Sequence, residues 1–315
     1  MLSVTIPPFE GAEKKLALIL SAPQSGMRSN SDDRWRSVVQ SSRSEIISKI
    51  STDGLDAYLL SESSLLVWED RIQMITCGQT TLVNALPEIL KFIDIRDIEL
   101  VFYEQKNYFF PWEQPASFED DLESLLEYFP GDSFRLGPSG GDHVHIFCTS
   151  HGTSTRGPDV TLQVLMHDLH PDKMEIFRSR TAGEEDEIER RSGLATLYPH
   201  MLKDRHIFSP PGYSINGIFE TDYFTVHVTP QATGSYAGFE TNIIEKDYSG
   251  ILNDITSIFE PGRFSVVLTS SMDDLCLPLH ATIKDVLPGY DVTENCRQEF
   301  KTGYAATFLN YRKGG

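Results

Sequence analysis

A polar interruption in a run of strands constrains this chain more than any other feature. Residues 55–78 contain two alternating apolar runs, at 57–60 and 65–68, and a third run that ends at Cys77. The polar cluster Ser61-Glu62-Ser63-Ser64 lies between the first two runs. Buried polar side chains are costly without hydrogen-bond partners. We therefore expect the cluster either to form a solvated bend or to carry out chemistry.

Length and composition indicate a globular protein with a sizeable core. The chain has 315 residues, of which 40% are apolar, and it shows neither a short repeat nor a low-complexity linker. We therefore expect residues 1–315 to form a single domain. The net charge of -19 argues against nucleic-acid binding, which needs clustered Lys and Arg. Solubility is the simpler explanation for this charge, and attraction of cationic ligands is the alternative.

Targeting and redox signals are weak throughout the sequence. The N-terminal segment lacks a basic start followed by a long apolar core, and no run approaches the roughly 18 apolar residues that span a bilayer. A soluble, cytoplasmic protein without membrane association is the expectation. Four scattered cysteines, at positions 77, 148, 276 and 296, fit neither a disulfide framework nor paired metal-ligand spacing. We expect each to be a free thiol.

Hydrophobic periodicity predicts alternating helices and antiparallel strands. A helix is expected to begin at Ser31 or Asp32 and to carry one apolar stripe, formed by Trp35, Val38, Val39, Ile46, Ile47 and Ile50. The first strands are expected at 57–60, 65–68 and 72–76, and the segment 12–22 is ambiguous between helix and strand. Further helices are expected at 82–93, 117–129, 184–191 and 248–259, and further strands at 98–103, 144–148, 160–166, 223–228, 236–241 and 264–268. This pattern is typical of an α/β or α+β sandwich.

Two other groups of residues invite a chemical interpretation. For the histidines at 143, 145, 151, 167 and 170, no nearby Cys or carboxylate completes a recognisable metal-ligand set, so we expect no metal. Residues 212–217, GYSING, resemble a nucleophile elbow but end in Asn-Gly, which is a turn signal. Ser214 and His227 end adjacent strand-like segments and could meet, but no carboxylate can be named to complete a hydrolase triad.

The Glu62-Ser63 bond suggests a different chemistry. A serine hydroxyl in a constrained bend can attack the preceding carbonyl and convert the amide into an ester. Removal of the Ser63 α-proton by a base then eliminates the ester, cuts the chain after Glu62 and leaves a pyruvoyl group. Composition alone would favour an ordinary turn at this place.

The motifs around these residues resemble the eukaryotic S-adenosylmethionine decarboxylase proenzyme family over nearly the whole chain. YLLSESSLLV at 58–67 and ITCG at 75–78 resemble its cleavage segment, and FSPPGYSING at 208–217 resembles its second motif. FEGAEK at 9–14, TVHVTP at 225–230 and SYAGFETN at 235–242 follow the family's order. The resemblance implies a four-layer α/β-β/α sandwich, with two face-to-face antiparallel sheets and helices outside. It also implies that segment 12–22 is a strand.

The resemblance implies a self-processing, pyruvoyl-dependent enzyme. Cleavage would give a β chain of residues 1–62 and an α chain of residues 63–315, with Ser214 holding the oxyanion and His227 acting as the processing base. The pyruvoyl group from Ser63 would form a Schiff base with S-adenosylmethionine and accept electrons as CO2 leaves, and Cys77 would donate the proton. The product would supply aminopropyl groups for spermidine and spermine synthesis. The substrate-binding residues implied are Phe9, Leu60, Glu62, Phe208 and Gln231, with Glu10 and Glu13 beside the active site.

Several positions depart from the animal pattern. Gln231 replaces a glutamate that binds the ribose hydroxyls. Asp159, Thr161 and Glu240 match a diamine site, but Ala17 and Gln163 replace two of its acids and Ile75 replaces a lysine. We therefore expect putrescine to stimulate weakly or not at all. The family includes monomers and dimers, so the resemblance implies either a monomer or a homodimer. The competing hypothesis is a catalytically weak paralogue that regulates an active partner.

Overall fold

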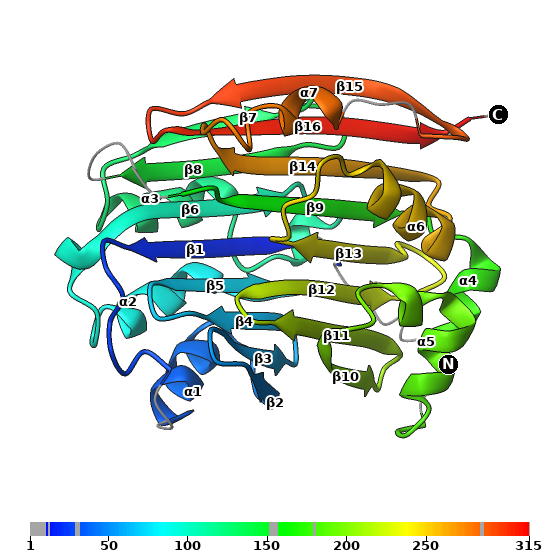
Figure 1. The fold of residues 1–315 in the computed structure, drawn as a ribbon, viewed down its shortest axis with the longest axis horizontal. Helices are drawn as coiled ribbons and strands as arrows, with labels where there is room; N and C mark the ends of the chain where they lie inside the picture. The colour runs from blue at the N-terminus through cyan, green and yellow to red at the C-terminus, as the bar shows by residue number, and fades with distance from the viewer. Residues whose placement is uncertain are drawn as a thin grey trace.

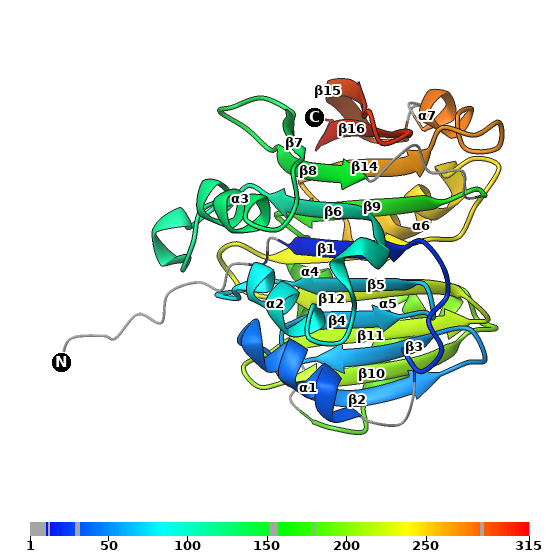
Figure 2. The ribbon, with the colours of Figure 1, turned by 90° about the vertical axis from the view of Figure 1, so that its left-hand side faces the viewer.

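Two eight-stranded antiparallel sheets pack face to face in this protein (Figures 1 and 2). The structure is a computed structural model, which describes residues 11, 13–28, 32–150, 157–178, 181–283 and 287–314. The first sheet contains β1 Lys14–Leu20, β2 Ile46–Ser51, β3 Asp56–Leu60, β4 Ser63–Val67, β5 Arg71–Thr76, β6 Ile98–Lys106, β7 Asp132–Leu136 and β8 Val144–Ser150. The second contains β9 Val160–His167, β10 Leu202–Phe208, β11 Gly212–Phe219, β12 Asp222–Thr229, β13 Tyr236–Thr241, β14 Arg263–Ser271, β15 Tyr290–Glu299 and β16 Tyr304–Lys313.

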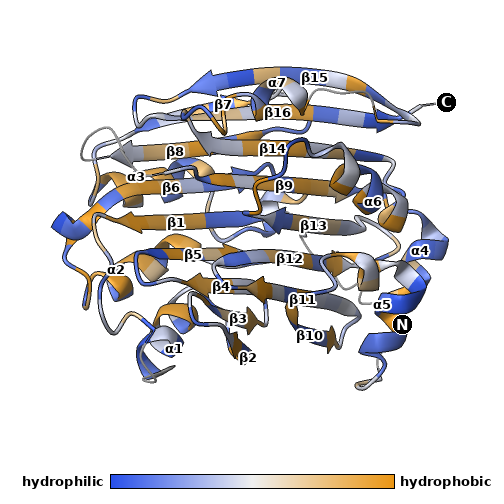
Figure 3. Ribbon diagram, in the orientation of Figure 1, coloured by the Kyte–Doolittle hydropathy of each residue, from blue (hydrophilic) through white to orange (hydrophobic). Residues whose placement is uncertain are grey.

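The two sheets share one topology. Their strand orders are β2-β3-β4-β5-β1-β6-β8-β7 and β10-β11-β12-β13-β9-β14-β16-β15, so each strand of the first sheet matches the strand eight places later. The sequence did not reveal this repeat because it contains no short period. Two sheets can share a topology when their apolar segments follow the same order, even where the residues themselves differ. In the hydropathy view, orange stretches lie along most strands and alternate with white and blue ones (Figure 3).

Helices cover the two outer faces and complete the expected four layers (Figures 1 and 2). Apolar residues of α1 Asp32–Ser41, α2 Ala85–Ile89 and α3 Phe118–Leu126 pack on the first sheet. Those of α4 Pro171–Ile176, α5 Glu185–Ser192, α6 Ser249–Phe259 and α7 Leu279–Thr282 pack on the second. Short 3-10 turns lie at Leu82–Asn84, Ile95–Asp97, Pro111–Glu113 and Leu194–Thr196. The predicted fold class is therefore confirmed.

The first predicted helix is too long in our sequence interpretation. The helix ends at Ser41. The three isoleucines assigned to its apolar stripe, Ile46, Ile47 and Ile50, lie in the edge strand β2. The hydroxyls of Ser41 and Ser42 donate to the carbonyls of Val38 and Val39, and Arg43 adopts a φ of 64°. These bonds compete with helix continuation, and the left-handed residue reverses the chain.

Two other segments show how pairing overrides local signals. Residues 14–20, ambiguous by propensity, form β1 at the centre of the first sheet, paired with both β5 and β6. The GYSING segment is not an elbow but part of the continuous strand β11, so the turn interpretation of Asn216-Gly217 was wrong. Gly217 is required there because a Cβ would lie 2.0 Å from the ring of Phe224 on β12. Strands β7, β10, β15 and β16 were missed.

Candidate functional site

The polar cluster forms a tight hairpin turn between β3 and β4. Leu60 pairs with Ser63, so Ser61 and Glu62 make the two-residue connection. Ser63 has a φ of 131°, in a region that residues with a Cβ rarely adopt. Such a conformation costs on the order of 1–3 kcal/mol and persists only where the surrounding structure enforces it. The strained residue is the serine that the sequence singled out.

The Glu62-Ser63 bond lies between a hydroxyl that has no hydrogen-bond partner among the described residues and a carbonyl that accepts two hydrogen bonds. The Ser63 side chain is buried, and its Oγ has no hydrogen-bond partner among the described residues. The Glu62 carbonyl oxygen accepts from the Cys77 amide at 3.0 Å and from Cys77 Sγ at 3.4 Å. Donors fixed on a carbonyl stabilise the negative charge that develops there during attack. The family resemblance assigns the oxyanion to Ser214, which stays a prediction; in this structure the groups that contact this oxygen belong to Cys77.

Ser214 and His227 face each other on neighbouring strands of the second sheet. They are register partners on β11 and β12, and Ser214 Oγ lies 2.8 Å from His227 Nδ1. Burial lowers the pKa of His227 to about 3, so the imidazole is neutral near pH 7. A neutral imidazole has a lone pair that can accept a proton. The meeting of these residues, which strand order suggested, is confirmed.

Two residues that sequence reasoning missed extend this pair. Ser64 Oγ donates to Asn216 Oδ1 at 2.6 Å and lies 3.2 Å from His227 Nε2. These bonds join β4 of one sheet to β11 and β12 of the other. The period of two along a strand was the available signal, because Asn216 lies two residues after Ser214 and shares its face.

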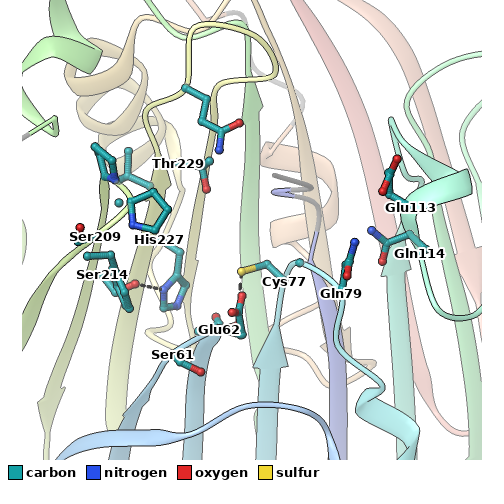
Figure 4. Close-up of a pocket in the computed structure, with 18 residues that line it drawn as sticks. Ser61, Glu62, Cys77, Gln79, Glu113, Gln114, Ser209, Ser214, His227 and Thr229 are labelled. Carbon is teal, nitrogen blue, oxygen red and sulfur yellow. Dashed lines mark hydrogen bonds between the residues drawn. The ribbon is translucent and has the colours of Figure 1, made fainter. Parts of the chain in front are cut away.

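A cavity of about 580 Å³ opens beside these groups (Figure 4). Of the residues predicted to form the site, it is lined by Glu62, Ser63, Cys77, Phe208, Ser214, His227 and Gln231. Gln79, Glu113 and Gln114 also line it and were not predicted. The side chain of Leu60, whose backbone was predicted to contact the adenine, is fully buried in the core of the first sheet and does not line the cavity. Phe9 and Glu10 lie outside the described residues. Burial raises the pKa of Glu62 to about 7.

Glu13 is not among the residues that line the cavity. It is 5% exposed, and burial together with the nearby Glu240 carboxylate raises its pKa to about 8. A Cβ on Gly238 would lie 1.9 Å from Glu13 Oε1, so the carboxyl group packs directly on that glycine. Gly238 is the register partner of His227. Glu13 therefore contacts the strand beside the candidate base.

The positions that match a diamine site are filled by this chain's own cations. Lys15 Nζ lies 3.2 Å from Glu240 and 3.2 Å from Glu104, and Arg71 pairs with Asp159. Gln163, which replaces an acid, donates to Glu240 at 2.6 Å. The cavity that remains, lined by Thr161 and Ala17 among others, has about 20 Å³. That volume has room for about one water molecule.

Other site types receive no support from the described residues. No group of three or more His, Cys, Asp and Glu side chains suited to a metal ion occurs in the described part of the chain. All four cysteines are free, as predicted. Among the helices that the structure describes, none combines the length and apolar character needed to cross a membrane.

Comparisons with known proteins agree with this geometry. The family model for adenosylmethionine decarboxylase matches residues 7–312. Similar curated proteins are the S-adenosylmethionine decarboxylase proenzymes of Dictyostelium discoideum (31% identical, covering 97% of this chain and 86% of that protein) and Trypanosoma cruzi (34%, covering 97% and 89%). The crystal structure of the Trypanosoma brucei AdoMetDC-delta26 monomer matches with a TM-score of 0.66 and 27% identity, over 80% of this chain and 99% of that one. The chain belongs to the adenosylmethionine decarboxylase family.

Proposed function

We propose that this chain cuts itself at Glu62-Ser63 and uses the resulting pyruvoyl group to decarboxylate S-adenosylmethionine. Membership of the family identifies the reaction, decarboxylation of S-adenosylmethionine for polyamine synthesis. The observation that carries self-processing is the buried, unpartnered Ser63 hydroxyl on a strained residue, next to a carbonyl that accepts two hydrogen bonds.

The first step converts the Glu62-Ser63 amide into an ester. Ser63 Oγ attacks the Glu62 carbonyl carbon, and the Cys77 amide and thiol hold the oxygen as it gains charge. The C–N bond breaks, and the proton from Oγ ends on the Ser63 nitrogen. Release of the strained backbone at Ser63 favours this step, because the new amine no longer has to keep a φ of 131°.

The second step is an elimination across the Ser63 Cα–Cβ bond. A base removes the α-proton, the electron pair forms the double bond, and the Glu62 carboxylate leaves with Oγ. His227 is the candidate, because it is neutral and lines the cavity with Ser63. The enamine then rearranges to an imine, and water replaces its nitrogen, which leaves as ammonia. The products are a β chain of residues 1–62 and an α chain of residues 63–315.

The residues around the cavity fit a binding role in the processed enzyme. A pyruvoyl group supplies a reactive carbonyl that accepts the substrate amine and draws the electrons left by CO2. We assign proton donation to Cys77, adenine stacking to Phe208 with Phe9, and ribose binding to Gln231. The backbone of Leu60 and Glu62 is assigned to the adenine edge, and Glu10 and Glu13 are assigned to the neighbourhood of the substrate. Residues 1–315 form one domain in this proposal, and a homodimer remains a prediction.

One gel tests the proposal. The purified chain should migrate as two fragments, whereas Ser63→Ala should remain a single 35.5 kDa band. The matched control is Ser61→Ala in the same turn. In the wild-type chain the Ser61 hydroxyl accepts from the Glu45 amide at 3.0 Å, and the variant without it should still be cut. A wild-type chain that stays intact, with Ser63→Ala indistinguishable from it, refutes self-processing.

The competing proposal is a catalytically weak paralogue that regulates an active partner. The presence of Ser63, Cys77, Ser214 and His227 in one arrangement favours the enzyme. The distinguishing result is a chain that is cut normally yet releases no CO2 from S-adenosylmethionine until a second, active chain is added.

A further inference from the structure

A row of four hydrogen-bonded side chains crosses the space between the sheets behind the cavity. It runs from Asn216 Oδ1 to Ser64 Oγ at 2.6 Å, from Ser64 Oγ to His227 Nε2 at 3.2 Å, and from His227 Nδ1 to Ser214 Oγ at 2.8 Å. The four side chains are buried, with Ser64 and Asn216 completely shielded at 0% exposure. Water is therefore excluded as a competing donor at the inner end of the row.

The direction of these bonds follows from the number of protons available. A hydroxyl has one proton, and that of Ser64 goes to Asn216 Oδ1, which can only accept. Ser64 Oγ therefore offers only lone pairs to His227, so the imidazole proton must lie on Nε2. A neutral imidazole carries a single N–H. His227 Nδ1 is then the nitrogen with the lone pair, and it accepts from Ser214.

The basic nitrogen lies on the side where the chemistry takes place. Ser63, Ser214 and His227 line the cavity, whereas Ser64 and Asn216 do not. We infer that Ser64 and Asn216 are positioning residues that hold His227 as its Nε2–H tautomer, with Nδ1 directed towards the cavity as the base. This assignment rests on the proposed self-processing and adds to it the group that orients the base.

The pair also supports His227 after it has taken the proton. When Nδ1 accepts the α-proton of Ser63, the ring becomes an imidazolium that donates from both nitrogens. Ser64 Oγ continues to accept from Nε2–H, and its own proton continues to go to Asn216. Before Nδ1 can accept the α-proton, the Ser214 hydroxyl must stop donating to it. Rotation of the hydroxyl about its Cβ–Oγ bond permits this. A hydroxyl and an amide thus do the work that a carboxylate does in a hydrolase triad.

The tautomer can be read directly in a chain that cannot be cut. We expect 15N-labelled histidine in the Ser63→Ala chain to give a pyrrole-type resonance for His227 Nε2 and a pyridine-type resonance for Nδ1. The resonances that disappear in His227→Gln identify those of His227. A pyrrole-type resonance for Nδ1 and a pyridine-type resonance for Nε2 would overturn the inference. This measurement does not require processing, so it stands even where the gel test of self-cleavage fails.

The rate of cutting gives the second test, followed on gels after a pulse of cell-free synthesis. Asn216→Leu frees the Ser64 proton to bond Nε2 and should slow cutting about 10- to 100-fold, as loss of an orienting partner does. Asn216→Asp can only accept, so its rate should lie closer to wild type than to Asn216→Leu. If instead the Asn216 amide were turned over and donated to Ser64, Asp would abolish that arrangement and cut as slowly as Leu, which overturns the inference.

A matched pair elsewhere in the same sheet provides the control. Ser265 Oγ donates to Asn310 Oδ1 at 2.6 Å, and both residues are buried, away from the cavity. Asn310→Leu removes the same kind of bond, together with the bond from the Asn310 amide to the Asp142 carbonyl, and should leave the cutting rate unchanged. Equal slowing in Asn310→Leu and Asn216→Leu would show that general destabilisation causes the effect, and would overturn the positioning role. A wild-type cutting rate in Asn216→Leu would also overturn that role.

Discussion

Removal of Lys15 should make the protein respond to small amines. Lys15 is 4% exposed, and its Nζ lies 3.2 Å from both Glu104 and Glu240. The two carboxylates raise the pKa of Lys15 against the opposing effect of burial, so the lysine is charged. Truncation to Ala leaves buried carboxylates without this cation. Breaking a buried pair in this way costs about 3–5 kcal/mol of the free energy of unfolding.

The space left by the lost side chain determines which molecules restore stability. In the wild-type chain only about 20 Å³ is free, so putrescine should neither stabilise the fold nor stimulate activity. In Lys15→Ala the three removed methylenes and the ammonium leave room for a propylammonium ion of the same shape. A bound amine at 100 times its dissociation constant recovers about 2.7 kcal/mol. We expect propylamine to recover part of the loss and methylamine, which fills less of the space, to recover less.

Urea unfolding in a Ser63→Ala background, which keeps one chain, measures these effects. The control is Lys49→Ala, because Lys49 is only partly buried and its partner Asp56 keeps Arg28 as a second cation. It should lose about 1 kcal/mol or less and show no amine response. The reasoning is refuted if Lys15→Ala is as stable as its parent, or if putrescine raises wild-type activity several-fold.

Three further outcomes follow from the site. Because burial raises the pKa of Glu62 from 4.5 to about 7, its proton is held more tightly in the folded chain. The free energy of unfolding should therefore fall as pH rises from about 4.5 to about 7, by at most about 3 kcal/mol, and Glu62→Gln in the Ser63→Ala chain should remove this slope in urea titrations. Gly238→Ala should cost about 1–3 kcal/mol in the same assay, since the new methyl would displace the buried Glu13 carboxyl, and an unchanged midpoint would contradict the packing. Gln231→Glu should lower KM about fivefold with kcat unchanged, because a charged acceptor gains about 1 kcal/mol per bond, and an unchanged KM would remove Gln231 from the ribose site.

The strands around Ser63 show which parts of the fold were accessible from sequence. The runs predicted as strands at 57–60, 65–68 and 72–76 became β3, β4 and β5 with little change. The predicted cores of α3, α5 and α6 were also correct, because capping residues and a 3.6-residue period act within one turn of chain. β7 and β15 were missed since each has at most one fully buried residue, and edge strands show no regular apolar alternation.

The sequence by itself determined the family motifs and the bond between Glu62 and Ser63 as the place of interest. It could not determine that Ser64 reaches across to Asn216 and His227, because residues some 150 positions apart meet only after two separate sheets have packed. Nor could it show that Lys15 fills the acidic space between the sheets, since alternation places its side chain on a face but does not name the opposing carboxylates. Local periodicity specifies strands and their faces, whereas the partners of buried polar groups are selected by the packing of the two sheets.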